Sequence, residues 1–173
     1  HPAGAELWTV VNERDMLGSD LVPDYMAQID EGHFYGWPWY YWGGFIDPRV
    51  PPEAEDRREY VRRPDYALGA HTAPLGMTFT KGAKLGERWD NGALIALHGS
   101  WNRKPASGYS VVYVAFGKDG RPLDALPVTL LDGFLAKDEA QTFGRPADVK
   151  IAGDGAALVA DDTAGIIWRV AAK

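Results

Sequence analysis

Three segments of this chain resemble one another, and the pattern that they share limits the possible fold more than any other feature. Each begins with Gly-Ala, continues as a short apolar run and ends in a polar loop; the segments are residues 4–14, 92–103 and 155–165. A proline-containing lead-in and an apolar run precede the second and third segments, and another apolar run follows them. Gly-Ala hairpins can recur by chance in any β protein, but strand, turn, strand, polar loop and strand is the order of a β-propeller blade. Because all these parts recur together, we predict an all-β fold, a segment of about three propeller blades.

Short apolar and β-branched runs bounded by Gly, Pro, Asp or Asn predict strands along most of the chain. They cover residues 6–11, 75–80, 93–97, 109–116, 128–131, 148–151, 156–160 and 166–170. Residues 15–29 and 136–142 are each predicted to hold a turn or a short helix, although neither keeps a helical apolar period. The mixed charges of residues 53–63 predict a solvated loop, and residues 47–66 a surface loop insertion in a single domain over 1–173.

The composition excludes several classes of site and partner. The chain has no cysteine, which rules out disulfides, zinc–thiolate sites, cysteine nucleophiles, cysteine-ligated iron–sulfur clusters and c-type haem attachment. No apolar stretch approaches the roughly 18 residues of a membrane-spanning helix. A net charge of −6 argues against a nucleic-acid partner, because phosphate contacts need a basic surface.

The propeller prediction places the polar loops at one end of the blades. Because neighbouring antiparallel strands reverse direction, the loop entering the first strand and the loop between the second and third strands lie at the same end. The polar loops are residues 12–15, 98–104 and 161–164, and the lead-ins 71–74 and 143–146 should join them. This end gathers several acids together with His71, Thr72, Trp101, Asn102, Arg103 and Arg145.

Motifs in these regions resemble a known family. They include Asn12-Glu-Arg-Asp15, Gly32-His-Phe-Tyr-Gly-Trp-Pro38, His71-Thr-Ala-Pro74, His98-Gly-Ser-Trp-Asn-Arg103 and Phe143-Gly-Arg-Pro146. Together they are similar to the C-terminal half of the L-sorbosone dehydrogenase-like family, which is related to soluble glucose and aldose dehydrogenases that use pyrroloquinoline quinone (PQQ). The resemblance implies a six-bladed propeller with PQQ and Ca²⁺ at the top of its channel. A sugar or an aldehyde such as sorbosone would pass a hydride to the quinone, and electrons would leave to an external acceptor.

The resemblance also implies which residues bind the quinone. PQQ carries three carboxylates and an ortho-quinone, so its site needs cationic donors and a hard cation with oxygen ligands. Arg145 takes the place of a cofactor-binding arginine, and Thr72 that of a cofactor-contacting threonine. Asn102 or Arg103 falls where a lysine lies, and Ala147 where a second arginine lies, so one contact is missing or relocated. The predicted cofactor-binding residues are His71, Thr72, Trp101, Asn102, Arg103 and Arg145.

Two calcium sites follow from the same resemblance. Main-chain carbonyls of Arg14 and Asp15 would bind the quinone-linked Ca²⁺, although the relatives have Gly-Pro there. Asp24 and Tyr35 would bind a separate structural Ca²⁺.

No catalytic residue is assigned within this chain. The family's general-base histidine and an Arg-Asn-Pro cofactor motif are expected upstream of residue 12, and the resemblance does not give that role to His71 or His98. General-base catalysis is typically worth about 10²–10⁴-fold, so the chain alone is predicted to be nearly inactive.

The number of blades bears on the extent of the domain. A closed propeller needs at least about four blades, so we expect residues 1–173 to be roughly the C-terminal half of a longer propeller that is processed or truncated before His1. The missing N-terminal half, a second copy or a swapped partner should cover the open edges. The family favours a periplasmic or secreted location, without a membrane partner.

Two other functions stay open at this point. A Ca²⁺-dependent lactonase would need several acidic and Asn side chains around a central metal, and the arginine-bearing loops argue against it. The other is a carbohydrate-binding or scaffold propeller without chemistry. Its candidate sugar-stacking platform is an aromatic run that is more readily explained as packing for a loop and a blade edge: Trp37, Trp39, Tyr40, Tyr41 and Trp42.

Overall fold

The computed structural model describes residues 1–2, 4–50 and 55–172. Within these ranges the regular structure is β-strand, apart from two short 3₁₀ helices, η1 (Glu55–Tyr60) and η2 (Glu87–Trp89). The strands are β1 (Leu7–Val11), β2 (Pro23–Ile29), β3 (Tyr40–Tyr41), β4 (Phe45–Ile46), β5 (Tyr66–Ala70), β6 (Pro74–Phe79), β7 (Gly92–Leu97), β8 (Ser110–Ala115), β9 (Val128–Leu131), β10 (Pro146–Ile151), β11 (Ala157–Asp161) and β12 (Ile166–Val170). The all-β prediction is confirmed, and the eight predicted strands all form, with ends that differ by at most two residues.

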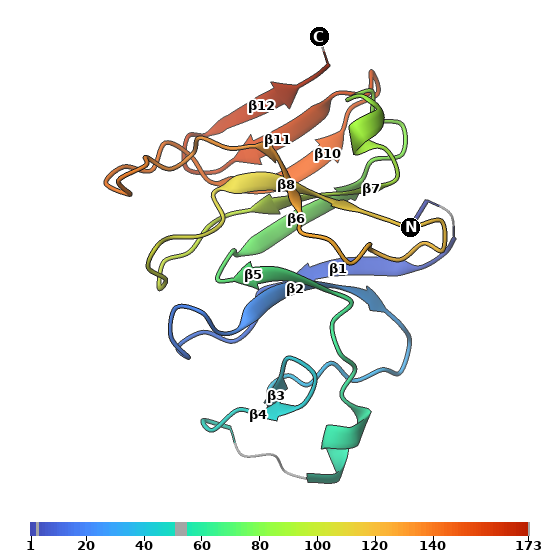
Figure 1. The fold of residues 1–173 in the computed structure, drawn as a ribbon, viewed down its shortest axis with the longest axis vertical. Coiled ribbons are helices and arrows are strands. Elements are labelled where there is room, and N and C mark those ends of the chain that lie inside the picture. Colours follow the sequence, from blue (N-terminus) through green and yellow to red (C-terminus); the bar gives the residue numbers. More distant parts are fainter. Residues whose placement is uncertain (3, 51–54, 173) are drawn as a thin grey trace.

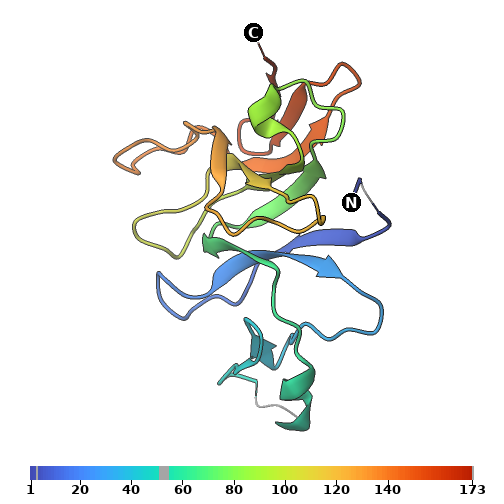
Figure 2. The same cartoon turned by 45° about the vertical axis from the view of Figure 1, so that its right-hand side comes forward.

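The strands form blade-like antiparallel sheets in chain order. A four-stranded sheet has the order β6-β7-β8-β9, and it lies between two three-stranded sheets with the orders β1-β2-β5 and β10-β11-β12. Figure 1 shows the three sheets one above another along the long axis of the molecule, and Figure 2 shows the same stacking turned by 45° about that axis. β10 packs on β6 and β7, and β1 packs on β6.

Strand β7 is the shared wall of two apolar clusters. The cluster toward the sheet of β1, β2 and β5 contains Trp8, Met26, Leu68, Ala93, Ile95, Leu97, Val112, Val114 and Phe116. The cluster toward the sheet of β10–β12 contains Leu85, Leu94, Ala96, Val111, Tyr113, Val149, Ala157 and Val159. Successive side chains of a strand point to opposite faces, so one strand can supply both clusters. All six residues of β7 are buried, and the central sheet is therefore covered on both faces.

The prediction for residues 15–29 was wrong in its second half. Pro23–Ile29 forms β2, which pairs with β1 on one side and β5 on the other. Its five central residues are all buried, so the strand lacks the alternation of apolar and polar residues that marks a half-exposed strand. Residues 136–142 form the predicted turn and no helix: the Glu139 N–H donates to the Ala136 carbonyl at 2.9 Å, and Leu135 and Thr142 make an isolated antiparallel bridge.

We call residues 30–65, which connect β2 to β5, the insert; its described part carries β3, β4 and η1 and lies at the bottom of Figure 1. It contains most of the predicted 47–66 insertion, of which residues 51–54 lie outside the described residues. Residues 57–60 are exposed, as predicted, but belong to η1 rather than to a loop. Most of the aromatic run packs within the insert: Tyr40 is 2% exposed and its ring contacts Phe34, whereas Trp37 is 72% exposed.

The link between β5 and β6 is only three residues long, His71 to Ala73. Two of these residues take left-handed backbone angles, with φ of 57° at His71 and 51° at Ala73. Non-glycine residues seldom adopt this conformation, so the surrounding contacts must hold it. None of the helices in the described ranges is long and apolar enough to span a membrane.

Candidate functional site

A cleft at one end of the sheets brings together three of the five segments that were predicted to meet, residues 12–15, 71–74 and 98–104. The cleft has a volume of about 240 Å³. Its lining residues come from the loop after β1, the start of β2, the β5–β6 link, the start of β6 and the loop after β7: Asn12, Glu13, Asp15, Asp24, His71, Ala73, Leu75, Gly99, Ser100, Trp101 and Asn102. Seven of these eleven side chains are polar or charged, so the cleft suits a polar ligand.

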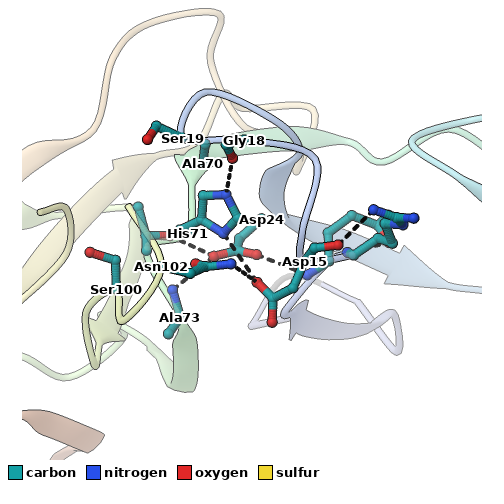
Figure 3. Close-up of polar contacts among 12 residues, drawn as sticks. Asp15, Gly18, Ser19, Asp24, Ala70, His71, Ala73, Ser100 and Asn102 are labelled. Atoms are coloured by element: carbon teal, nitrogen blue, oxygen red, sulfur yellow. Dashed lines mark hydrogen bonds and ion pairs between the residues drawn. The ribbon is translucent and has the colours of Figure 1, made fainter. Parts of the chain in front are cut away.

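Asp24, near the start of β2, connects two of the loops. Its Oδ1 accepts a hydrogen bond from the backbone N–H of Glu13 at 2.8 Å, and its Oδ2 accepts from the Ala73 N–H at 2.7 Å and the Thr72 hydroxyl at 3.2 Å. Figure 3 shows the Asp24 carboxylate near Ala73. Burial raises the pKa of Asp24, and the three hydrogen bonds act in the opposite direction. The bonds to Thr72 and Ala73 stabilise the strained β5–β6 link.

A second cluster joins Asp15, His71 and Asn102. The Oδ1 of Asp15 lies 3.1 Å from His71 Nδ1 and accepts a hydrogen bond from the Asn102 amide at 3.2 Å (Figure 3). The other ring nitrogen of His71, Nε2, lies 2.8 Å from the Gly18 carbonyl oxygen. Both ring nitrogens therefore face acceptor oxygens.

One buried acceptor in the cleft makes no hydrogen bond to the described residues, the Oδ1 of Asn102. A buried polar atom without a partner costs free energy, so this oxygen suits a ligand donor or a cation. No group of three or more His, Asp or Glu side chains in the described ranges is placed to hold a metal ion. A hard cation here would take its oxygens from this amide, from backbone carbonyls and from a bound anionic ligand. The residues fit a cation shared with an organic ligand.

Arg145 ties two loops together beside the cleft. Its Nε donates to the His98 carbonyl at 3.0 Å and its Nη2 to the Gly99 carbonyl at 2.5 Å, so two of its five N–H groups are used. Its guanidinium also lies 5.3 Å from the centre of the Tyr109 ring. His98 Nε2 in turn lies 2.9 Å from Asp162, and this hydrogen bond lowers the pKa of that carboxyl.

Hydrogen bonds join six of the ten predicted site residues in two groups: Arg14, Asp15, His71 and Asn102 form one, and Asp24 and Thr72 form the other. Trp101 also lines the cleft, at its mouth, with 71% of its surface exposed. Of the two residues considered for the place of a lysine, Asn102 lines the cleft, whereas Arg103 bonds to Asp20 and to the Pro105 carbonyl.

Some of the predicted site residues lie outside the cleft lining. Arg14 is buried against Asp47, and Arg145 bridges loops as described above. The Tyr35 hydroxyl donates to the Gln28 carbonyl and accepts from the Asp30 N–H, near the opposite end of β2 from Asp24. Asp24 and Tyr35 are thus not brought together by their side chains, and the calcium roles of these residues stay predictions.

Glu13 and Asp47 contribute to the site, and neither was singled out from the sequence. The Oε1 of Glu13 accepts from the Arg14 N–H at 3.0 Å, its Oε2 accepts from the Trp42 N–H at 3.2 Å, and burial raises its pKa. Glu13 lies within the 12–15 loop that the sequence predicts for this face. Its contact with Trp42, 29 residues away, has no signal in the sequence.

The sheets form a segment of a β-propeller, a fold that this chain shares with solved sugar dehydrogenases. The calcium structure of Trichoderma reesei Carbohydrate-Active Enzymes Family AA12 matches 96% of this chain with a TM-score of 0.77 and 19% identity, and the match covers 48% of that chain. The holo PQQ domain of pyranose dehydrogenase from Coprinopsis cinerea matches 94% of this chain with a TM-score of 0.65 and 22% identity, and the match covers 50% of that domain.

A family model described as TrAA12-like matches residues 48–173, and the chain belongs to this family. An uncharacterized protein of Borreliella burgdorferi is 32% identical over 171 residues, which cover 98% of this chain and 44% of that protein. A pyrroloquinoline quinone-dependent pyranose dehydrogenase of Coprinopsis cinerea is 34% identical over 123 residues, 62% of this chain and 16% of that protein. The chain thus spans less than half of these curated relatives. The narrower resemblance to L-sorbosone dehydrogenases stays a prediction.

Proposed function

We propose that the full-length protein containing this chain is a PQQ- and Ca²⁺-dependent dehydrogenase that oxidises an aldose sugar or an aldehyde such as sorbosone. The observation that carries the proposal is the polar cleft with the unpaired Asn102 oxygen, in a chain of the TrAA12-like family. The periplasm or the cell exterior is its proposed location, and electrons pass to an external acceptor.

The residues of this chain have binding roles in the proposal. Asn102 contributes its Oδ1 to the cation, and Asp15 holds the Asn102 amide in place through the 3.2 Å hydrogen bond. Arg145, with N–H groups beyond those used on the His98 and Gly99 carbonyls, binds a carboxylate of the quinone. When bound, the quinone supplies the hydride-accepting carbonyl.

The general base is proposed to lie in another part of the full-length protein. Both ring nitrogens of His71 face oxygens of this chain, so neither is directed at a sugar hydroxyl. His98 Nε2 lies 2.9 Å from Asp162, and His98 is not among the residues that line the cleft. The chain is accordingly proposed to be one part of a larger propeller, closed by the remainder of the protein.

The test is a dye-linked oxidation assay of the purified full-length protein across a panel of aldoses and aldehydes, with and without PQQ and Ca²⁺. We expect turnover that requires both cofactors. Arg145→Ala should weaken PQQ binding by about tenfold or more, the loss typical of one charge-assisted hydrogen bond. The matched control is Arg169→Ala, which removes an exposed arginine of β12 that pairs with Asp154.

Three outcomes would contradict the proposal. The first is neither binding nor turnover with any cofactor and substrate pair. Hydrolysis of lactones in place of oxidation would favour the lactonase. Glycan binding by calorimetry without PQQ, together with no oxidation, would favour a carbohydrate-binding propeller, for which the exposed Trp37 and Trp101 are the natural contact residues.

A further inference from the structure

A buried ion pair joins the insert to the cleft loop of residues 12–15. Arg14 lies in that loop and Asp47 lies in the insert, 33 residues further along the chain. The guanidinium donates from Nε to Asp47 Oδ2 at 2.8 Å and from Nη2 to Oδ1 at 3.0 Å, and both side chains are 3% exposed. This two-bond geometry fixes the direction of the arginine as well as its distance.

The same guanidinium also holds the backbone of the neighbouring cleft residue. Its Nη1 donates to the carbonyl oxygen of Asp15 at 2.7 Å. The side chain of Asp15 is the one that contacts both His71 and Asn102. A continuous series of hydrogen bonds therefore runs from Asp47 through Arg14 to Asp15, and from there to two cleft side chains.

Within the insert, Asp47 is held in place by a neighbouring residue, Arg49. Arg49 donates its backbone N–H and its half-exposed guanidinium to the Asp47 carboxylate. Hydrogen bonds from Arg14 and Arg49 hold the pKa of Asp47 well below its usual value, so the carboxylate stays ionised across the physiological range. A second tie runs from the Trp42 N–H in the insert to the Glu13 side chain in the same loop.

We propose that the insert is a positioning element for the cleft, in which Arg14 and Asp47 set the place of Asp15 and, through it, of His71 and Asn102. A buried ion pair is weak evidence for stability, because desolvation offsets much of its Coulomb energy. The ion pair matters here for its geometry, because the planar Arg14 guanidinium bonds to the Asp47 carboxylate and to the Asp15 carbonyl at the same time. The predicted effect on ligand affinity rests on the proposed quinone function, and the positioning itself does not.

The test uses the full-length protein labelled with ¹³C at the histidine Cε1 positions, with the His71 signal assigned by its loss from a His71→Gln variant. Asp47→Asn removes the charge of the insert carboxylate at nearly constant shape. The control Arg49→Ala removes only the half-exposed partner of the same carboxylate. We expect the His71 signal to shift in Asp47→Asn and to stay unchanged in Arg49→Ala.

A second variant and a binding measurement complete the design. Arg14→Lys keeps the positive charge but cannot bond to three oxygens in one plane, so it should also shift the His71 signal, and it carries the test if Asp47→Asn does not fold. The PQQ dissociation constant should rise about tenfold in both variants, the loss typical when a residue behind a ligand-holding group is removed, with kcat at saturating PQQ within about twofold.

An unchanged His71 signal in the variants that fold would overturn the positioning role, whatever happens to the melting temperature. If the parent protein binds no PQQ at all, the proposed quinone function fails. The histidine spectra then still decide the positioning role, so the two failures are distinguishable.

Discussion

Two glycines bring the loops of the cleft closer together than any other residue would allow. A Cβ atom on Gly108 would lie 2.6 Å from the Thr72 carbonyl oxygen and 2.7 Å from the Gly99 Cα. A Cβ atom on Gly99 would lie 2.4 Å from the ring of Tyr109. Gly108 also has a φ of 82°, in the left-handed region. The β5–β6 link and the loop after β7 thus meet backbone to backbone.

Gly108→Ala should lower the free energy of unfolding by about 2 kcal/mol or more, because the methyl group clashes with backbone that cannot move aside. The matched control is Gly82→Ala, which has a similar φ of 85° but no atom within 4 Å of the added methyl. The free energy of unfolding of the control should fall by only about 1 kcal/mol, the cost of a left-handed backbone conformation for alanine. Urea unfolding of both variants measures the difference, and equal losses would contradict the close-approach argument.

The sequence predicts the single residues of the site only in part. The alternation of strands and polar loops places Asp15, His71 and Asn102 on one face, because that follows from strand direction alone. The partner of a buried charge does not follow from such a pattern. Arg14 lies in a predicted site loop, yet its carboxylate partner is 33 residues away in an irregular connection. Its role as a positioning residue emerges only from the folded chain.

At the scale of the elements, the exposed edge of β12 stands out. In the central sheet β9 pairs with the outer edge of β8, whereas no strand among the described residues pairs with the outer edge of β12. Three apolar side chains of β12 are exposed: Ile166 by 44%, Ile167 by 70% and Trp168 by 40%. An exposed apolar edge strand is a template for pairing with another chain.

Ile167→Lys should therefore slow aggregation of the 173-residue chain, with the free energy of unfolding within about 0.5 kcal/mol of the parent. Light scattering during incubation measures the aggregation, and urea unfolding measures the stability. Leu126→Lys is the control: Leu126 is 90% exposed but lies outside any strand, so its replacement should not change aggregation. The argument about the edge fails if both variants aggregate alike.

Predictability of the elements depends on how each strand is covered. β9 and β12 form over the predicted residues, since both are short apolar runs bounded by turn residues. β2 is missed because it is buried on both faces and carries Asp24 and Gln28, whose polar groups find partners inside the fold. β3, β4 and β5 were not predicted either. They belong to or follow the insert, whose path depends on contacts with the 12–15 loop.

At the scale of the molecule, we propose that this chain is one part of a larger propeller, and the three stacked sheets and the TrAA12-like family support that proposal. The 173-residue chain alone should oxidise sugars at least about 10²-fold more slowly than the full-length protein, at equal PQQ and Ca²⁺, because it lacks the proposed general base. Parallel dye-linked assays of the two proteins measure the ratio. Comparable rates would show that the chain contains its own base.

The three residues from His71 to Ala73 have a double task. They connect the sheet of β1, β2 and β5 to the sheet of β6–β9, and two of them, His71 and Ala73, line the cleft. The Asp24 carboxylate accepts hydrogen bonds from Thr72 and Ala73 in this link and from the Glu13 N–H in the 12–15 loop. The backbone of residues 71–73 therefore influences both the angle between the two neighbouring sheets and the shape of the cleft. A substitution that changes the angle between these two sheets should also change the shape of the cleft, even when the substituted residue does not line it.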